Sequence, residues 1–268
     1  MPSPIISVRN MSMSFEKDGK RVDVLKDITF DVARGSTVCI LGPSGCGKST
    51  LLKAMIGAHR PTGGEVVVDG EDIVGMNERN LDRVRKKLGV LFQSGALLNS
   101  MTVGQNVSLP IEMHTKLDPE TIMIMVKVKL EQVGLSHAID RLPAEISGGM
   151  QKRAALARAI ALDPKMVFHD EPSAGLDPIA TAVIDGLIND LKTKMGITNI
   201  VVTHVMESVR RIADHIIMLD RGNVLLNGSL RDLLESKDPR IVRFVNGEIQ
   251  GDEAEGGAFW AFVKDLLM

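Results

Sequence analysis

The sequence contains few cysteines and few aromatic residues, and it has no long apolar run. Only two cysteines, one Trp and no Tyr occur among its 268 residues, so a disulfide framework is excluded. No stretch of about 18 apolar residues is present, so we expect any membrane role to depend on a partner. No signal-peptide pattern is visible either, and we expect a cytoplasmic protein with reduced thiols.

The sequence also lacks a strong charge of either sign. It contains 32 Lys and Arg residues and 34 Asp and Glu residues, and the basic residues are spread along the chain. We therefore expect no nucleic-acid partner. With 44% hydrophobic residues, the chain can bury a full core as one large domain or two small ones.

A glycine-rich segment at residues 42–50 lies between an apolar strand pattern and the start of a helix. Its glycines let several backbone N–H groups converge on phosphate oxygens, and the helix adds the positive end of its dipole. We expect Lys48 to reach the β- and γ-phosphates and Ser49 to ligate Mg²⁺. The segment therefore predicts a nucleoside triphosphate site. Its nucleotide-binding residues are Gly42, Pro43, Ser44, Gly45, Cys46, Gly47, Lys48, Ser49 and Thr50.

The periodicity of the sequence predicts an α/β fold. Residues 5–30 are strand-like with a hairpin turn, and the β segment at 65–70 completes an antiparallel layer. Between about residues 94 and 162 the pattern is helical, with a helix that starts at Asp118-Pro119. Strands and helices alternate again over residues 166–226, which is typical of a mostly parallel sheet flanked by helices. We predict an N-terminal antiparallel β subdomain and an inserted α-helical subdomain beside this core.

Two acidic residues, Asp170 and Glu171, follow directly on a hydrophobic strand pattern. Ligands of parallel α/β sheets bind at the carboxyl ends of the strands. Asp170 is placed to hold Mg²⁺ directly or through water, and Glu171 to accept a proton from an attacking water. Together with the phosphate loop, the pair predicts nucleotide hydrolysis.

A second helix start suited to anions occurs at Ser147, Gly148 and Gly149. Ser147 has the chemistry of an N-cap, and the two glycines allow close approach of the backbone to an anion. Because the chain's own loop already surrounds its phosphates, this helix end predicts a nucleotide held by a second copy. We expect a head-to-tail dimer with twofold symmetry.

These motifs, in this order, resemble those of the ATP-binding-cassette (ABC) proteins over residues 5–236. The resemblance implies a P-loop NTPase (RecA-like) core that hydrolyses ATP. Its catalytic residues would be Lys48, Glu171, Gln93 and His204. The resemblance also implies that Gln93 senses Mg²⁺ and the attacking water, and that His204 contacts the γ-phosphate. The same comparison identifies Asp177 as a residue of the dimer interface.

Some positions leave alternatives open. Phe15 is the candidate for stacking on adenine, although a strand core residue is the other reading, and Phe30 is a weaker rival because its position looks buried. Met150 replaces the usual Gln of the motif and leaves the serine and glycines intact. His169 stands where an aliphatic residue is usual, and we interpret it as hydrogen-bonded in the core rather than titrating near the site. We interpret Cys46 as a small tolerated side chain rather than a redox-sensitive thiol.

The run at residues 91–103 and the segment at 238–247 resemble the ATPase subunits of the Mla phospholipid-transport group. That resemblance implies two permease subunits whose cytoplasmic helix inserts near residues 93–101. It further implies an Mce-type periplasmic lipid-binding partner, a small accessory protein, and a place on the cytoplasmic face of the inner membrane. The alternatives are the ATPase of an importer for amino acids or other small solutes, and an ATP-driven clamp acting on ribosomes, DNA or a cluster-assembly scaffold.

We place the ABC ATPase domain at residues 1–237, with the helical subdomain at about 94–162, and a C-terminal extension at 238–268. Apolar residues, including the only Trp of the chain, cluster at Phe259–Leu267. This cluster either docks on a second copy, as it can in the Mla group, or packs on its own domain, or is disordered.

Overall fold

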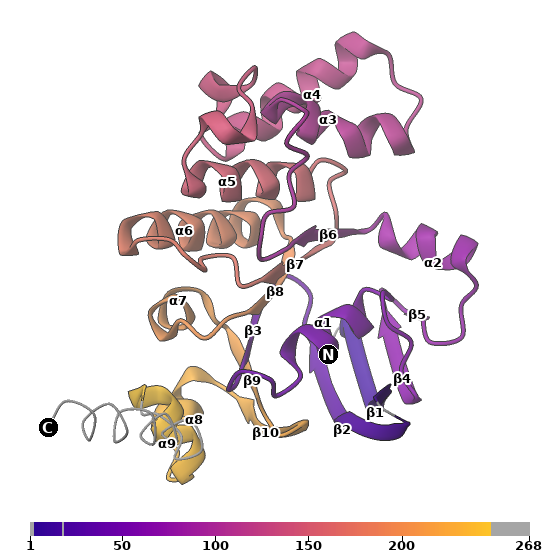
Figure 1. The fold of residues 1–268 in the computed structure, drawn as a ribbon, viewed down its shortest axis with the longest axis vertical. Helices are drawn as coiled ribbons and strands as arrows, with labels where there is room; N and C mark the ends of the chain where they lie inside the picture. The colour runs from indigo at the N-terminus through magenta and orange to yellow at the C-terminus, as the bar shows by residue number, and fades with distance from the viewer. Residues whose placement is uncertain (1–2, 18, 248–268) are drawn as a thin grey trace, which may run out of the picture.

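Two β-sheets and a layer of helices make up the computed structural model, which describes residues 3–17 and 19–247 (Figure 1). The cluster at Phe259–Leu267 lies outside these described residues. The α-helices of the described part are α1 Lys48–Met55, α2 Glu78–Arg85, α3 Val103–His114, α4 Pro119–Gln132, α5 Gly148–Ala159, α6 Pro178–Met195, α7 Met206–Ile212, α8 Leu230–Leu234 and α9 Pro239–Asn246.

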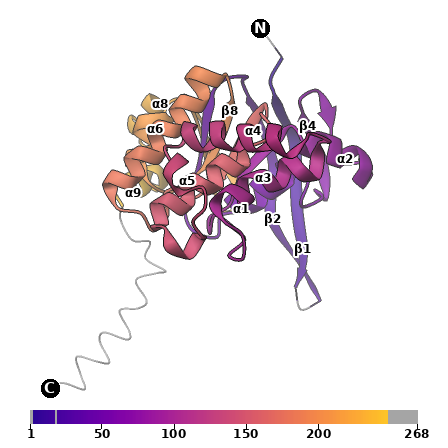
Figure 2. The ribbon, with the colours of Figure 1, turned by 90° about the horizontal axis from the view of Figure 1, so that it is seen from above.

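The first sheet is antiparallel, with strand order β2-β1-β4-β5. Its strands are β1 Ile6–Lys17, β2 Lys20–Val32, β4 Gly63–Val68 and β5 Glu71–Asp72. Near the end of β2, Ile28, Phe30 and Val32 are buried while the residues between them are exposed, so one face of the strand packs on the core. β1 and β2 form the predicted hairpin, which projects from the body of the molecule (Figure 2).

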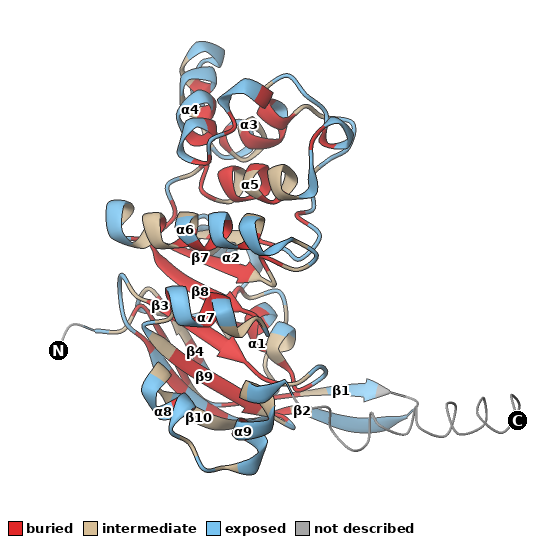
Figure 3. Ribbon diagram, turned by 90° about the vertical axis from the view of Figure 1, so that its left-hand side faces the viewer, coloured by how far each residue is buried: buried red, intermediate tan, exposed pale blue. Residues whose placement is uncertain are grey.

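The second sheet has the order β10-β9-β3-β8-β7-β6. Its strands are β3 Thr37–Leu41, β6 Leu88–Leu91, β7 Met166–Asp170, β8 Thr198–Val202, β9 His215–Asp220 and β10 Asn223–Gly228. All neighbours are parallel except β9 and β10. Every residue of β3 and of β8 is buried, as expected for parallel strands covered on both faces (Figure 3). The carboxyl ends of β3, β7 and β8 therefore meet at one edge, which positions the site.

Helices α3, α4 and α5 form a layer beyond α6 (Figures 1 and 3). Each begins at a side-chain cap, provided by Thr102, Asp118 and Ser147 respectively. Their buried faces share one hydrophobic cluster, to which α4 contributes Ile122, Val126 and Leu130. The apolar spacing of α4 is therefore explained by core packing.

Helix α9, the first part of the expected C-terminal extension, packs against the core. Ile241 of α9 is buried in a cluster that includes Cys39 of β3 and Met218 of β9. The boundary at residue 237 stays a prediction. In the described part of the chain, no helix is both long and apolar enough to cross a membrane.

Candidate nucleotide-binding and hydrolysis site

The phosphate loop joins the carboxyl end of β3 to the start of α1. Gly42 and Gly47 have φ angles of 143° and 108°, which L-residues with side chains rarely adopt. A Cβ at Gly42 would lie 2.3 Å from the carbonyl oxygen of Leu219, so the chain passes too closely for any other residue. No side chain caps α1, which begins directly at Lys48. The first N–H groups of α1 are thus available to an anion.

Lys48 lies half-buried across its own loop. Its Nζ donates hydrogen bonds to the carbonyl oxygens of Gly42 at 2.7 Å and Pro43 at 2.9 Å. The ammonium is thereby held against its own loop, where it could form charge-assisted hydrogen bonds with a polyphosphate.

Ser49 and Asp170 meet between α1 and β7. The Oγ of Ser49 donates to Oδ1 of Asp170 at 3.3 Å. Burial raises the pKa of Asp170, and the nearby charge of Glu171 acts in the same direction, while the Ser49 bond opposes them. A cation bound here would favour the ionised carboxylate.

Glu171 and His204 come from the ends of the neighbouring strands β7 and β8. Nδ1 of His204 lies 2.9 Å from Oε1 of Glu171, whose Oε2 is buried and has no hydrogen-bond partner among the described residues. Glu171 has a φ of 50°, and its N–H donates to the carbonyl oxygen of Val202. The backbone bond to Val202 and the contact with His204 therefore hold Glu171 at the ends of β7 and β8.

Gln93 follows β6 and is exposed. Its carbonyl oxygen accepts a hydrogen bond from Nζ of Lys152 in α5. In the described part of the chain, no hydrogen bond joins its side chain to Ser49 or Asp170. The fold brings Gln93 to the strand edge but does not join it to the predicted metal ligands.

Ser147, Gly148 and Gly149 lie at the start of α5, in the helical layer. Ser147 is exposed and accepts a hydrogen bond from the N–H of Met150 at 3.3 Å, as predicted for an N-cap. α5 and α1 lie apart, with strands β6, β7 and β8 between them (Figure 1). One chain therefore does not bring this helix start to its own phosphate loop.

Asp177 caps α6, with Oδ1 accepting from the N–H groups of Ile179 and Ala180 at 2.9 Å. The next apolar side chain, Ile179, is 80% exposed. A capping acid beside an exposed apolar residue is consistent with the predicted contact to a second copy.

Phe15 of β1 is 39% exposed and packs its ring edge-on against His59, with centroids 5.6 Å apart. Phe30, its rival for adenine stacking, is buried. Only Phe15 of the two offers a ring to a ligand.

His169 and Cys46, for which the sequence allowed either a structural or a chemical role, are both buried. His169 lies 3.0 Å from Asn199, and burial lowers its pKa to about 4, so it is a neutral core residue at pH 7. Burial also raises the pKa of the Cys46 thiol. Both observations agree with the structural interpretation of these residues.

Sequence reasoning gave no role to three residues that hold the loop after Gln93. Lys152 donates to the carbonyl oxygen of Gln93, and Arg158 donates to those of Gly95 and Ala96. Asn106 binds the N–H and carbonyl of residue 98 and further carbonyls at 101 and 102. Lys152 and Gln93 are separated by 59 positions, so no local pattern could have paired them.

Comparison with known proteins decides the family. The family described as ABC transporter matches residues 25–174. A curated relative from Haemophilus influenzae, named "Intermembrane phospholipid transport system ATP-binding protein MlaF", is 44% identical over 267 residues and covers 100% of both chains. The chain belongs to the ABC transporter family. The MlaF protein of Escherichia coli K12 is 43% identical to this ABC protein, over 85% of each chain.

The fold of this ABC protein is shared with solved cassettes. A dimeric ATP-binding cassette in a post-hydrolysis state, bound to ADP and Pi, matches with a TM-score of 0.79 at 30% identity. The match covers 84% of this chain and 99% of that cassette. The predicted fold class and the predicted ABC ATPase are confirmed.

Proposed function

We propose that this ABC protein works as a head-to-tail dimer whose ATP hydrolysis drives phospholipid transport through a membrane permease. The observation that carries the transport role is the similarity to MlaF along the full length of both chains. The hydrolysis chemistry is supported by the geometry of Lys48, Glu171 and His204. The individual site residues are part of this proposal.

Glu171 is the base for the attacking water. Its Oε2 is buried and has no partner among the described residues, so it can accept a proton, while His204 holds Oε1 at 2.9 Å. Lys48 and the N–H groups of α1 stabilise the charge on the terminal phosphate. His204, which is largely exposed, is placed to reach the same phosphate.

The donor atoms at this edge fit Mg²⁺. A hydroxyl from Ser49 and a carboxylate from Asp170 lie 3.3 Å apart, and oxygen donors of this kind suit Mg²⁺. The described residues hold no cluster of three or more His, Cys, Asp or Glu side chains for a metal ion. Most remaining ligands would be phosphate oxygens and water, with Gln93 as the further protein ligand. When bound, Mg²⁺ would neutralise charge on the β- and γ-phosphates.

A second copy would complete each site. Ser147 and Gly148 are exposed, and a Cβ at Gly148 would meet no atom within 4 Å, so the helix start is open to an incoming phosphate. We place this end against the γ-phosphate held by the partner's loop, with Gly149 and Asp177 at the same interface.

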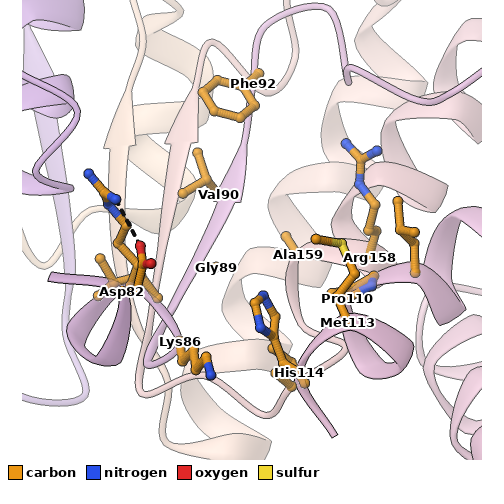
Figure 4. Close-up of a pocket in the computed structure, with 14 residues that line it drawn as sticks. Asp82, Lys86, Gly89, Val90, Phe92, Pro110, Met113, His114, Arg158 and Ala159 are labelled. Carbon is orange, nitrogen blue, oxygen red and sulfur yellow. Dashed lines mark hydrogen bonds and ion pairs between the residues drawn. The ribbon is translucent and has the colours of Figure 1, made fainter. Parts of the chain in front are cut away.

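A groove beside Gln93 is the docking site for the permease. It has a volume of about 480 Å³ and lies between α2, β6, α3 and α5 (Figure 4). Apolar side chains such as Phe92 and Met113 line it together with cationic Lys86 and Arg158. An amphipathic cytoplasmic helix with an acidic side fits this lining.

The remaining partners follow from the proposed transport role. They are two permease subunits, an Mce-type periplasmic lipid-binding protein and a small accessory protein. The protein would then lie on the cytoplasmic face of the inner membrane without crossing it.

Reconstitution tests the proposal. The protein is combined with the permease and lipid-binding proteins that purify with it, in vesicles that carry a fluorescent phospholipid. We expect the labelled lipid to move only with ATP, and Glu171→Gln to stop the movement. Hydrolysis stimulated by an amino acid or other small solute, with no movement of lipid, would refute the phospholipid role, as would purification with ribosomes or DNA in place of a permease.

A further inference from the structure

Lys152 is a buried cation with no role in the function described so far. It lies on α5, five positions after Ser147, and only 8% of the residue is exposed to solvent. Its Nζ donates to the carbonyl oxygen of Gln93. A buried ammonium is costly unless its N–H groups and its charge are matched, so its surroundings indicate what it does.

The loop after Gln93 is held by the same helix. Arg158, also on α5, donates to the carbonyl oxygen of Ala96 at 2.7 Å and to that of Gly95 at 2.8 Å. Lys152 and Arg158 together bind three of the four carbonyl oxygens from Gln93 to Ala96. The loop beside the permease groove and the helix that begins at Ser147 are therefore joined as one unit.

Lys152 also interacts electrostatically with two acids of the hydrolysis site. The charges of Glu171 and Asp170 act on its ammonium and oppose the lowering of its pKa by burial. An ammonium carries three N–H donors, and the carbonyl of Gln93 accepts one. Oε2 of Glu171 is buried and has no partner among the described residues. Lys152 is thus hydrogen-bonded to the loop and attracted by the charges of Glu171 and Asp170.

We propose that Lys152 is a positioning residue for hydrolysis: its hydrogen bond to Gln93 holds the permease-side loop and α5 in the arrangement that Glu171 requires. This inference rests on the proposed function, because it uses Glu171 as the base and the groove as the docking site. It assigns to α5 a second task besides presenting Ser147 to the partner copy.

Two substitutions separate the hydrogen bond from the rest of the side chain. Lys152→Met removes the donor but keeps a similar length, and an apolar side chain suits a buried position, so the variant is expected to fold. Lys152→Gln loses the charge and keeps an N–H donor for the Gln93 carbonyl. We expect Met to lower kcat about tenfold and Gln to stay within about threefold of the parent.

Arg153→Met is the matched control. Arg153 is the next residue of α5, and it donates to the carbonyl oxygens of Val133 and Gly134, away from the Gln93 loop. We expect its kcat to stay within about twofold of the parent. ATP affinity, measured with a fluorescent nucleotide, is expected to stay within about twofold in all three variants, since none removes a phosphate contact.

Hydrogen exchange provides a readout that does not depend on activity. Backbone amides at residues 94–97 are expected to exchange faster in Lys152→Met and at the parent rate in Lys152→Gln and Arg153→Met. If Lys152→Met does not fold, Lys152→Leu takes its place in both assays.

Three results would overturn the inference: turnover of Lys152→Met within about twofold of the parent, an equal loss in Lys152→Gln, or unchanged exchange in the loop. Turnover is measured on the isolated protein without lipid, so a failure of phospholipid transport would leave this test intact. In the full transporter complex, Lys152→Met is expected to lose the stimulation by the permease that Lys152→Gln keeps.

Discussion

Two glycine-rich helix starts differ in what the chain provides for them. The phosphate loop is held in place by its own chain, since Gly42 packs against the backbone of Leu219 and Lys48 binds the loop carbonyls. The start of α5 is exposed, and Ser147 caps only its own helix. In the proposed dimer, one chain therefore builds the first half of the site, and the second half is presented to the partner copy. Substitutions in each half test this division.

Glu171→Gln is expected to have the largest effect. The amide cannot accept the proton, so turnover should fall by about 10²- to 10⁴-fold, as for other general bases. ATP binding should remain, and ATP should then hold the two halves together as a stable dimer. Phosphate release and size-exclusion chromatography with ATP measure the two effects. Turnover within a few-fold of the parent would remove Glu171 from the base role.

Lys48→Ala should impair the half of the nucleotide site that one chain builds by itself, the phosphate loop. Loss of a charge-assisted contact to phosphate, about 1.5–3 kcal/mol, should weaken ATP binding by about 10- to 150-fold. Equilibrium binding of a fluorescent ATP analogue measures this. Lys53→Ala removes an exposed lysine from the same helix and serves as the control. Equal affinities of Lys48→Ala and the parent would contradict the role of Lys48.

Ser147→Ala should impair the half of the site that is presented to the partner copy. We expect a smaller effect than that of Lys48→Ala. ATP binding should persist, while turnover should fall about tenfold because one contact to the γ-phosphate is lost. Mixing Lys48→Ala with Ser147→Ala chains should restore turnover, since one of the two shared sites then contains neither change. Mixing Lys48→Ala with a chain carrying both changes leaves no intact site, since every phosphate loop then lacks Lys48, and should show no such recovery. Equal turnover in the two mixtures would refute the shared site.

Asp69→Asn should affect neither half of the nucleotide site and should lower only the stability of the folded protein. Arg34, Lys87 and Lys165 bind Asp69 at 2.8–3.0 Å and hold its pKa below its usual value. The folded state therefore binds fewer protons than the unfolded state, whose Asp titrates near pH 3.9. The stabilisation is complete above that pH and is lost as the pH falls. We expect a loss of about 1–3 kcal/mol at pH 7 and a smaller loss in acid. Urea unfolding at pH 7 and pH 3.5 checks this; equal losses would contradict it.

Strong local signals made much of the fold predictable from the sequence. Asp118-Pro119 predicts the start of α4, and the apolar strand before Asp170 predicts β7, because caps and buried parallel strands leave local patterns. Helix α2 was not predicted. It buries only Leu81 and Val84 among charged residues, so it lacks a wide apolar face. α3 was missed as a separate helix, and Pro110 inside it obscures the pattern.

The candidate site divides in the same way. Lys48, Glu171 and Ser147 lie in short motifs whose chemistry can be read locally. The bond from Lys152 to Gln93 and the contact of Phe15 with His59 join residues far apart in the chain. Such pairs depend on how the two sheets and the helical layer pack, and no spacing in the sequence encodes them.

The burial of both thiols has a practical consequence for spectroscopy. Cys39 and Cys46 are the only cysteines, and burial raises the pKa of each, so we expect both to react slowly with maleimide reagents. A cysteine introduced on the exposed surface of the natural sequence would therefore carry a fluorescent or spin label selectively. Distances between labels on two chains could then be followed through a catalytic cycle without first removing the native thiols.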